Sequence, residues 1–223
     1  MSEGSTVKRV RRTKAEQRAE TLEQILDAAE YLFSQNGLHG VTLRDVALRV
    51  GVHTTLLHYY FDDKRSLFDA VFARRAAVTS GRRMEALDRY EASAGDHPTV
   101  EGALHAFLDT DLDLYIDGGE PWMNYAAFCA RVSNTPEGAE LMDVHFDPVV
   151  LRLVSILKRA LPDTPEADIF WGYHFVTGSL MNTLARTGRI DRLSGSVCRS
   201  DDFPAVRERL AKFMAAGFLA LSA

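Results

Sequence analysis

The sequence predicts an all-α protein: an N-terminal helix-turn-helix three-helix domain followed by a larger helical domain. Apolar residues recur at three- and four-residue steps through most of the 223 residues, and no segment shows the alternation of a half-buried strand. Two short helical patterns, residues 43–50 and 54–60, meet at Gly51, which permits the positive φ of a tight turn between helices.

Composition places the chain among ordinary globular proteins. It is 46% hydrophobic and 26% charged, which excludes disordered and collagen-like classes. No apolar run approaches the ~18 residues of a membrane span, and the N-terminus lacks an apolar core, so we expect a cytoplasmic protein associated with the nucleoid. Cys129 and Cys198 lack zinc-site spacing, and we interpret both as reduced thiols, with a redox pair as the less favoured alternative.

The first predicted elements form the helix-turn-helix unit. Residues 15–36 carry a helical stripe that stops at Gly37. Thr42 and Asp45 form a capping box at the start of residues 43–50. In the second motif helix, residues 54–60, Leu57 and Phe61 should anchor the inner face.

The next segments predict a helix from 64 to 81, a short helix at 83–92 beyond Gly81, and a helix at 99–117. Val78 belongs to the expected inner stripe of the first of these. The alternating Asp109, Asp111 and Asp113 suggest a calcium loop at first sight, but the helical periodicity favours a solvated acidic face.

The remaining segments are also helical. A helix starts at Pro121, Thr135-Pro136 caps the next, and Asp147-Pro148 predicts a break or kink within it. Long helices follow at 165–187 and 204–221, separated by a loop at 189–202. These last two helices are apolar on more than one face, so we expect them to meet a second copy of the chain; burial within one subunit is the alternative.

Charge is unevenly distributed along the chain. The net charge is −5, yet residues 1–80 hold 12 Lys and Arg against 10 Asp and Glu, and the remainder holds 14 against 21. Residues 1–18 form a basic arm, which we expect to be flexible and to enter a minor groove or follow phosphates; a solubilising tail is the alternative. The arm's basic residues are Lys8, Arg9, Arg11, Arg12, Lys14 and Arg18.

Residues 20–72 resemble the TetR (tetracycline-repressor-like) family of bacterial transcriptional regulators. The resemblance rests on the helix ending at Gly37, Gly-Val-Thr at 40–42, Ala-x-x-x-Gly-Val at 47–52, and Leu-x-x-Tyr-Phe leading to Lys64. Leu56 and His58 depart from it, because the family usually has a small polar residue and an aromatic at these positions. The resemblance implies a DNA-binding domain at 19–65 and a ligand-binding and dimerisation domain at 66–223.

The second motif helix should enter the DNA major groove with Thr54, Thr55 and His58 outward. Arg44 matches a position from which relatives reach DNA, and its forked donors suit guanine. Thr42, Tyr60 and Lys64 should contact phosphate, and Tyr59 should lie in the core. The predicted DNA-binding residues are Thr42, Arg44, His53, Thr54, Thr55, His58, Tyr60 and Lys64.

Metal and enzyme readings find little support. His53 and His58 do not stack on one helical face, and no carboxylate or thiol completes a metal site. The chain has no nucleophile elbow, no glycine-rich phosphate loop and no His-Glu-x-x-His motif. We therefore expect no catalytic residues, no metal and no cofactor.

Family members enclose a small molecule in the second domain. Most aromatic residues there should be core, but polar residues among them favour a cavity. The effector should be hydrophobic or aromatic, and a carboxylate on it could be oriented by a histidine or by Arg131. The candidate lining residues are Phe107, Trp122, Tyr125, Cys129, His145, Phe170, His174 and Met181.

These observations predict a homodimeric repressor that binds a near-palindromic operator and is released by its effector. The alternative from another class is a helical small-molecule-binding or enzyme-like protein that uses the helix-turn-helix as a protein-contact surface.

Overall fold

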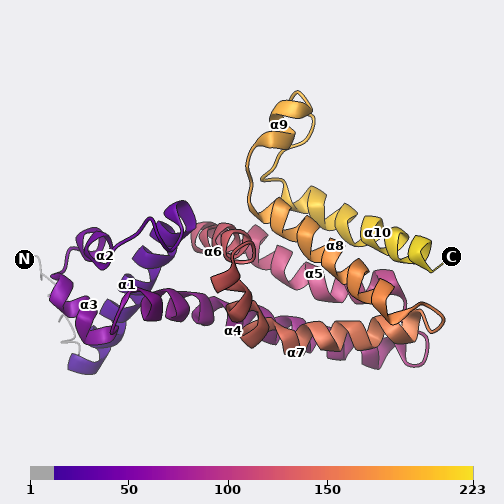
Figure 1. Ribbon diagram of the computed structural model, residues 1–223, viewed down its shortest axis with the longest axis horizontal. Helices are drawn as coiled ribbons and strands as arrows, with labels where there is room; N and C mark the ends of the chain where they lie inside the picture. Colours follow the sequence, from indigo (N-terminus) through magenta and orange to yellow (C-terminus); the bar gives the residue numbers. More distant parts are fainter. Residues whose placement is uncertain (1–12, 223) are drawn as a thin grey trace, which may run out of the picture.

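The protein is elongated, with a small three-helix unit at one end and a larger helical body at the other (Figure 1). The structure is a computed structural model and describes residues 13–222. Over that range the helices are α1 Lys14–Asn36, α2 Leu43–Val50, α3 Thr54–Tyr60, α4 Lys64–Ala94, α5 Val100–Asp117, α6 Gly119–Val132, α7 Pro136–Ala160, α8 Glu166–Leu184, α9 Arg189–Leu193 and α10 Phe203–Leu221. None of these described helices is long and apolar enough to cross a bilayer.

The first three helices begin and end where the sequence predicts. Thr42 and Asp45 form the expected capping box, and Gly51 ends α2 with a φ of 81°. A second capping box, Thr13 with Glu16, starts α1 at Lys14. The last residues of the predicted arm, 14–18, are therefore helical, whereas residues 1–12, with four of its basic side chains, lie outside the described residues.

Helix α4 differs from the prediction because it runs unbroken from Lys64 to Ala94. Gly81 does not stop it: the residue faces open space, and Arg83 and Leu87 beyond it are buried against α5 and α7. Packing of the next turn thus outweighs the weak helix propensity of one glycine. The register also differs, because Thr79 rather than Val78 lies on the buried face.

Two later elements also differ from the prediction. Helix α7 continues through Pro148 without a break, and Figure 1 shows it changing direction along its length. The expected loop at 189–202 contains the five-residue helix α9, which projects away from the body (Figure 1).

One hydrophobic core joins the small unit to the body. The Phe68 ring of α4 lies 5.0 Å from Phe33 of α1 and 5.0 Å from Phe128 of α6, both edge-on. Such aromatic contacts stabilise beyond the area they bury. The three-helix unit is therefore packed on the same helix that enters the body.

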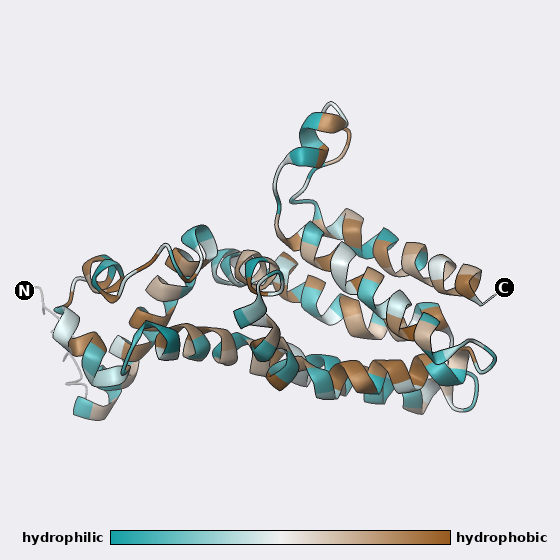
Figure 2. Cartoon of the chain, in the orientation of Figure 1, coloured by the Kyte–Doolittle hydropathy of each residue, from teal (hydrophilic) through white to brown (hydrophobic). Residues whose placement is uncertain are grey.

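The outer face of α8 and α10 is not covered within the chain. Trp171 and Phe175 of α8 and Phe213 of α10 are exposed, and hydrophobic residues follow both helices (Figure 2). Gly178 and Gly217 leave open space beside their backbones.

Candidate nucleic-acid interface and ligand cavity

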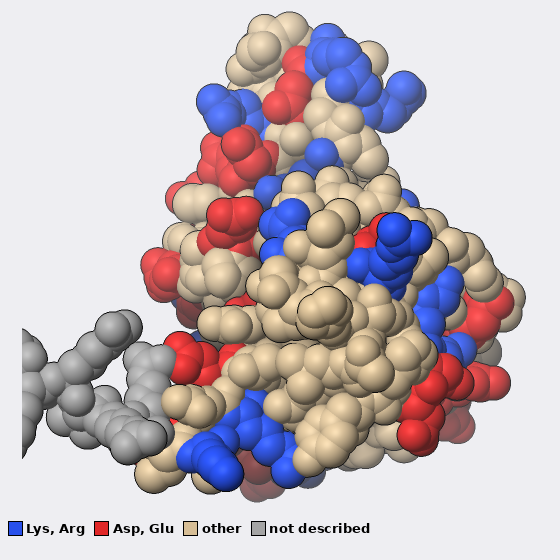
Figure 3. Space-filling model, turned by 90° about the vertical axis from the view of Figure 1, so that its left-hand side faces the viewer, with Lys and Arg blue, Asp and Glu red and all other residues tan. Residues whose placement is uncertain are grey.

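Helices α2 and α3 present a polar surface at the end of the molecule. Leu57 and Phe61 are buried and hold α3 in place. The opposite side of this unit carries mainly exposed polar side chains, with Thr54 and Leu56 partly exposed and Arg44, His53, Thr55 and His58 exposed. Figure 3 looks onto this end, where uncharged side chains occupy the centre and basic groups lie beside them.

The ends of α2 and α4 are fixed by side-chain caps. The Thr42 hydroxyl donates to Asp45 Oδ2 at 2.7 Å, and its backbone N–H donates to the same oxygen at 2.9 Å. These hydrogen bonds lower the pKa of the Asp45 carboxyl. Asp63 caps α4 through the Ser66 N–H, so Lys64 stands at the first position of that helix, partly exposed.

The two tyrosines of α3 have exchanged the roles we expected. Tyr59 is exposed, whereas the Tyr60 hydroxyl donates to the Arg18 carbonyl of α1 at 3.2 Å. The reason is helical geometry, because Tyr60 lies three residues after the buried Leu57 and shares its face, while Tyr59 does not. The Arg18 guanidinium lies 5.0 Å from the Tyr59 ring centre.

A cavity of about 280 Å³ lies in the helical body between α4, α5, α6, α7 and α8. Its lining comprises Thr79, Arg83, Phe107, Asp111, Tyr115, Tyr125, Cys129, Ser133, Ala139, Met142, Asp143, Phe146, Asp147, Val150, Tyr173, Val176, Thr177, Leu180 and Met181. Aromatic and aliphatic side chains form most of this wall, as is usual for a small-molecule site.

Four of the eight predicted ligand residues line this cavity: Phe107, Tyr125, Cys129 and Met181. The other four lie outside it. Trp122 packs edge-on against Tyr125 and beneath Arg75, and His145 packs against Phe72. Phe170 and His174 are exposed on α8, and Arg131 instead donates to the Ser34 carbonyl of α1.

Sequence reasoning missed the polar centre of the cavity, a buried ion pair. Arg83 Nη2 lies 2.7 Å from Asp111 Oδ2, and the guanidinium lies 4.1 Å from the Phe107 ring centre. The signal was present, because Arg83 follows Phe72, Ala76 and Thr79 at helical steps on the buried face of α4. Asp111 is buried and so departs from the solvated acidic face we expected, whereas Asp109 and Asp113 remain partly exposed beside Arg207.

The ion pair leaves unused hydrogen-bonding capacity in the wall. Among residues 13–222, Arg83 Nε, Asp111 Oδ1 and Tyr125 Oη are buried without a hydrogen-bond partner. Tyr115 and Thr79 lie close by without reaching hydrogen-bond length and angle. Unsatisfied buried polar groups are costly, so these atoms favour a polar group or water within the cavity.

Burial controls ionisation in the cavity. It raises the pKa of the Asp111 carboxyl, and the neighbouring Arg83 acts in the opposite direction. Burial likewise raises the pKa of the Cys129 thiol to about 12. Cys129 is therefore a neutral packing group rather than a nucleophile.

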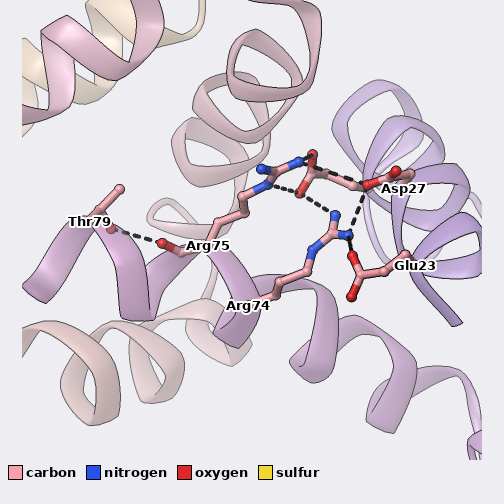
Figure 4. A network of polar contacts seen from close by, with 6 residues as sticks. Glu23, Asp27, Arg74, Arg75 and Thr79 are labelled. Carbon is pink, nitrogen blue, oxygen red and sulfur yellow. Dashed lines mark hydrogen bonds and ion pairs between the residues drawn. The ribbon is translucent and has the colours of Figure 1, made fainter. Parts of the chain in front are cut away.

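A second polar cluster connects α4 to α1. Glu30 of α1 accepts hydrogen bonds from Arg74 Nη2 and Arg75 Nε, both at 3.1 Å. Arg74 also reaches Glu23 at 2.9 Å and Asp27 at 2.8 Å (Figure 4). The Thr79 hydroxyl, one turn further along α4 and in the cavity wall, donates to the Arg75 and Ala76 carbonyls.

Comparison with known proteins identifies both parts of the chain. Residues 25–71 match the family of bacterial regulatory proteins called the tetR family, and residues 105–217 match the tetracyclin repressor-like C-terminal domain. The chain belongs to the TetR family. This TetR-family protein is accordingly a DNA-binding transcriptional regulator, as the resemblance implied.

Individual relatives share the fold over most of the chain. The transcriptional regulator BetI of Escherichia coli (strain K12 / DH10B) is 26% identical over 166 residues, which is 74% of this chain and 83% of BetI. A TetR-family regulator from Mesorhizobium loti superposes with a TM-score of 0.56 at 17% identity, covering 94% of this chain and 98% of its own. FadR from Bacillus subtilis, solved with stearoyl-CoA, gives 0.54 at 16%, covering 87% and 98%.

Proposed function

We propose that this regulator is a repressor that binds a near-palindromic operator as a homodimer and releases it when a small, mainly apolar molecule fills the cavity. One observation carries the proposal. Helix α4 begins at Lys64, directly behind the DNA-facing helix α3, and the same unbroken helix places Thr79 and Arg83 in the cavity wall. A ligand that moves this wall therefore acts on the helix that holds the DNA-binding unit.

The DNA contacts follow from exposure and position. Thr54, Thr55 and His58 enter the major groove, with Arg44 donating to guanine and His53 beside them. Thr42 and Lys64 contact phosphate. Tyr59 takes the phosphate role first given to Tyr60, because the Tyr60 hydroxyl is already bonded to α1. Residues 19–65 thus serve DNA binding and 66–223 ligand binding and dimerisation, with α4 crossing that boundary.

The exposed face of α8 and α10 supports the homodimer. A hollow of about 480 Å³ between these helices is lined mainly by apolar residues, including Phe175, Phe213 and Gly217. A contiguous apolar surface of this kind favours a self-complementary two-fold contact. Two copies joined here would present two DNA-binding units about one helical turn, ~34–36 Å, apart.

Release needs only a modest coupling between the cavity and the DNA-binding surface. Filling the cavity displaces α4 at Thr79 and Arg83, and the Glu30 cluster transmits the movement to α1. A coupling of ~1–3 kcal/mol changes operator occupancy several-fold or more. The unpaired atoms of Arg83, Asp111 and Tyr125 favour an effector that adds one hydrogen-bonding group to an apolar skeleton.

Gel-shift titration against genomic fragments tests the proposal. At least one fragment with a near-palindrome should bind well above random DNA, and failure of every such fragment would refute it. Thr55→Ala should reduce mainly the preference between sequences, whereas Lys64→Ala should weaken binding to all sequences and flatten its salt dependence. Ser155→Ala, exposed on α7, is the control and should change neither property.

A further inference from the structure

We propose that residues 186–200, the α9 segment, of one subunit dock on α7 of the partner subunit and close the mouth of the partner's cavity. The inference rests on the homodimer of the proposed function and adds to it a residue contribution from the second copy.

The α9 segment carries apolar side chains that nothing in its own chain covers. It projects from the body at the end of α8 (Figure 1), and Leu193 and Val197 are 77% and 85% exposed. Ile190 is also exposed. Three large apolar side chains on one short projection indicate a surface that is buried in the assembled protein.

The segment also carries unpaired positive charge. Arg199 pairs with Asp201 at 2.9 Å, and Arg186 donates to the Met123 carbonyl at 3.0 Å. Arg189 and Arg192 are exposed, and no acidic partner for either is present between residues 13 and 222.

Helix α7 presents the complementary surface. Glu140, Asp143 and Asp147 are exposed on it at three- and four-residue steps, with Val144 between them 72% exposed. Glu140 lies 3.9 Å from Arg65, whereas Asp143 and Asp147 have no basic partner within the described range. This acidic and apolar strip matches the basic and apolar α9 segment in both respects.

The strip lies at the cavity. Asp143 and Asp147 are exposed and also line the cavity, so they mark its opening toward solvent. Docking on them would cover that opening. A bound effector would then leave only after the partner's segment had moved, which links effector exchange to the dimer interface.

The second copy is favoured as the occupant because the exposed faces are continuous. The α9 segment leaves the C-terminal end of α8, whose outer face adjoins the uncovered face of α10. A subunit seated on that face places its own α9 segment beside the first subunit, and two-fold symmetry repeats the contact.

Cys198, the exposed cysteine of the α9 segment, allows a direct test. Chains carrying Val144→Cys and Cys198→Ser are exchanged with wild-type chains and oxidised mildly. We expect a disulfide joining position 144 of one chain to Cys198 of the other, identified by peptide mapping. Ser155→Cys, about 16 Å further along α7, replaces Val144→Cys in the control and should cross-link several-fold less.

Charge reversal provides a second readout. Asp143→Arg should lower the cross-linking yield several-fold, and Arg192→Asp on the opposite chain should restore it. Restoration distinguishes a specific contact from a damaged fold.

The outcomes separate the two proposals. Yield no higher than the Ser155→Cys control, in a dimer that still binds its operator, would overturn the docking inference and leave the proposed function standing. With Val144→Cys in a wild-type background, a disulfide within one chain would overturn it as well. A monomer that binds no operator would refute the proposed function, and the docking inference with it.

Discussion

The ion-pair cluster at Glu30 gives the most specific prediction about how the two parts of the protein are held together. Glu30→Gln keeps the size of the side chain but removes the charge that Arg74 and Arg75 share. The Glu30 side chain is only 3% exposed, so water cannot replace the lost carboxylate. We expect the substitution to destabilise the fold and to loosen α1 from α4.

The magnitude follows from burial. Removing one partner of a buried ion pair costs ~3–5 kcal/mol, and the low end applies because Arg74 keeps Glu23 and Asp27. A loss of about 3 kcal/mol in a chain of this size lowers the Tm by ~6–12 °C. Glu85→Gln, which affects only an exposed pair with Arg89 on α4, should stay within ~0.5 kcal/mol of wild type.

Thermal unfolding followed by circular dichroism measures this loss, and a double-mutant cycle with Arg75→Met measures the coupling itself. We expect a coupling energy of about 1 kcal/mol or more between positions 30 and 75. Additive effects of the two substitutions, or a Tm for Glu30→Gln equal to that of Glu85→Gln, would show that the cluster does not join α1 to α4.

Three further predictions concern single sites. Because burial raises the pKa of Cys129 to about 12, a thiol reagent at pH 8 should modify only Cys198 in the native protein and both cysteines in denaturant; rapid modification of Cys129 would refute its burial. Because hydrogen bonds lower the pKa of Asp45 in the fold, its stabilising effect is present above the unfolded value of ~3.9 and is lost as pH falls through the folded value, so the Tm difference between wild type and Asp45→Asn should shrink toward acid pH; a constant difference would contradict this. Gly81→Ala should stabilise the protein by ~0.5–1 kcal/mol, since α4 is helical and open there, whereas Gly138→Ala should destabilise it in the same unfolding assay because its Cβ would lie 1.9 Å from the Val132 carbonyl oxygen; a destabilising Gly81→Ala would indicate a break in α4.

Local signals predicted the DNA-binding end more fully than the cavity. The ends of α2 and α3 depend on a capping box, a glycine turn and three-to-four-residue spacing, which are all readable within a few residues. The one error there, exchanging Tyr59 and Tyr60, came from not applying the spacing from Leu57. The cavity depends instead on which faces of five helices meet, and no local pattern specifies that.

The misplacement of Asp111 shows the same limit in physical terms. An aspartate on a helix is ordinarily solvated, and only the partner on another helix makes its burial tolerable. Arg83, the partner, lay beyond a glycine at which we predicted that the helix would end. Once that break was assumed, Arg83 and Thr79 fell on different helices and could not be placed in one wall.

Continuity at Gly81 therefore has a functional consequence. Arg75 holds α1 through Glu30, its carbonyl accepts the Thr79 hydroxyl, and Thr79 and Arg83 face the cavity on the following turns. A helix moves as a rigid unit over such a distance, so displacement of the cavity wall reaches the Glu30 cluster without an intervening hinge. Under the proposed function, substitutions that insert a flexible break between positions 75 and 83 should reduce the effector's influence on DNA while leaving both binding sites intact, which separates transmission along α4 from binding at either end.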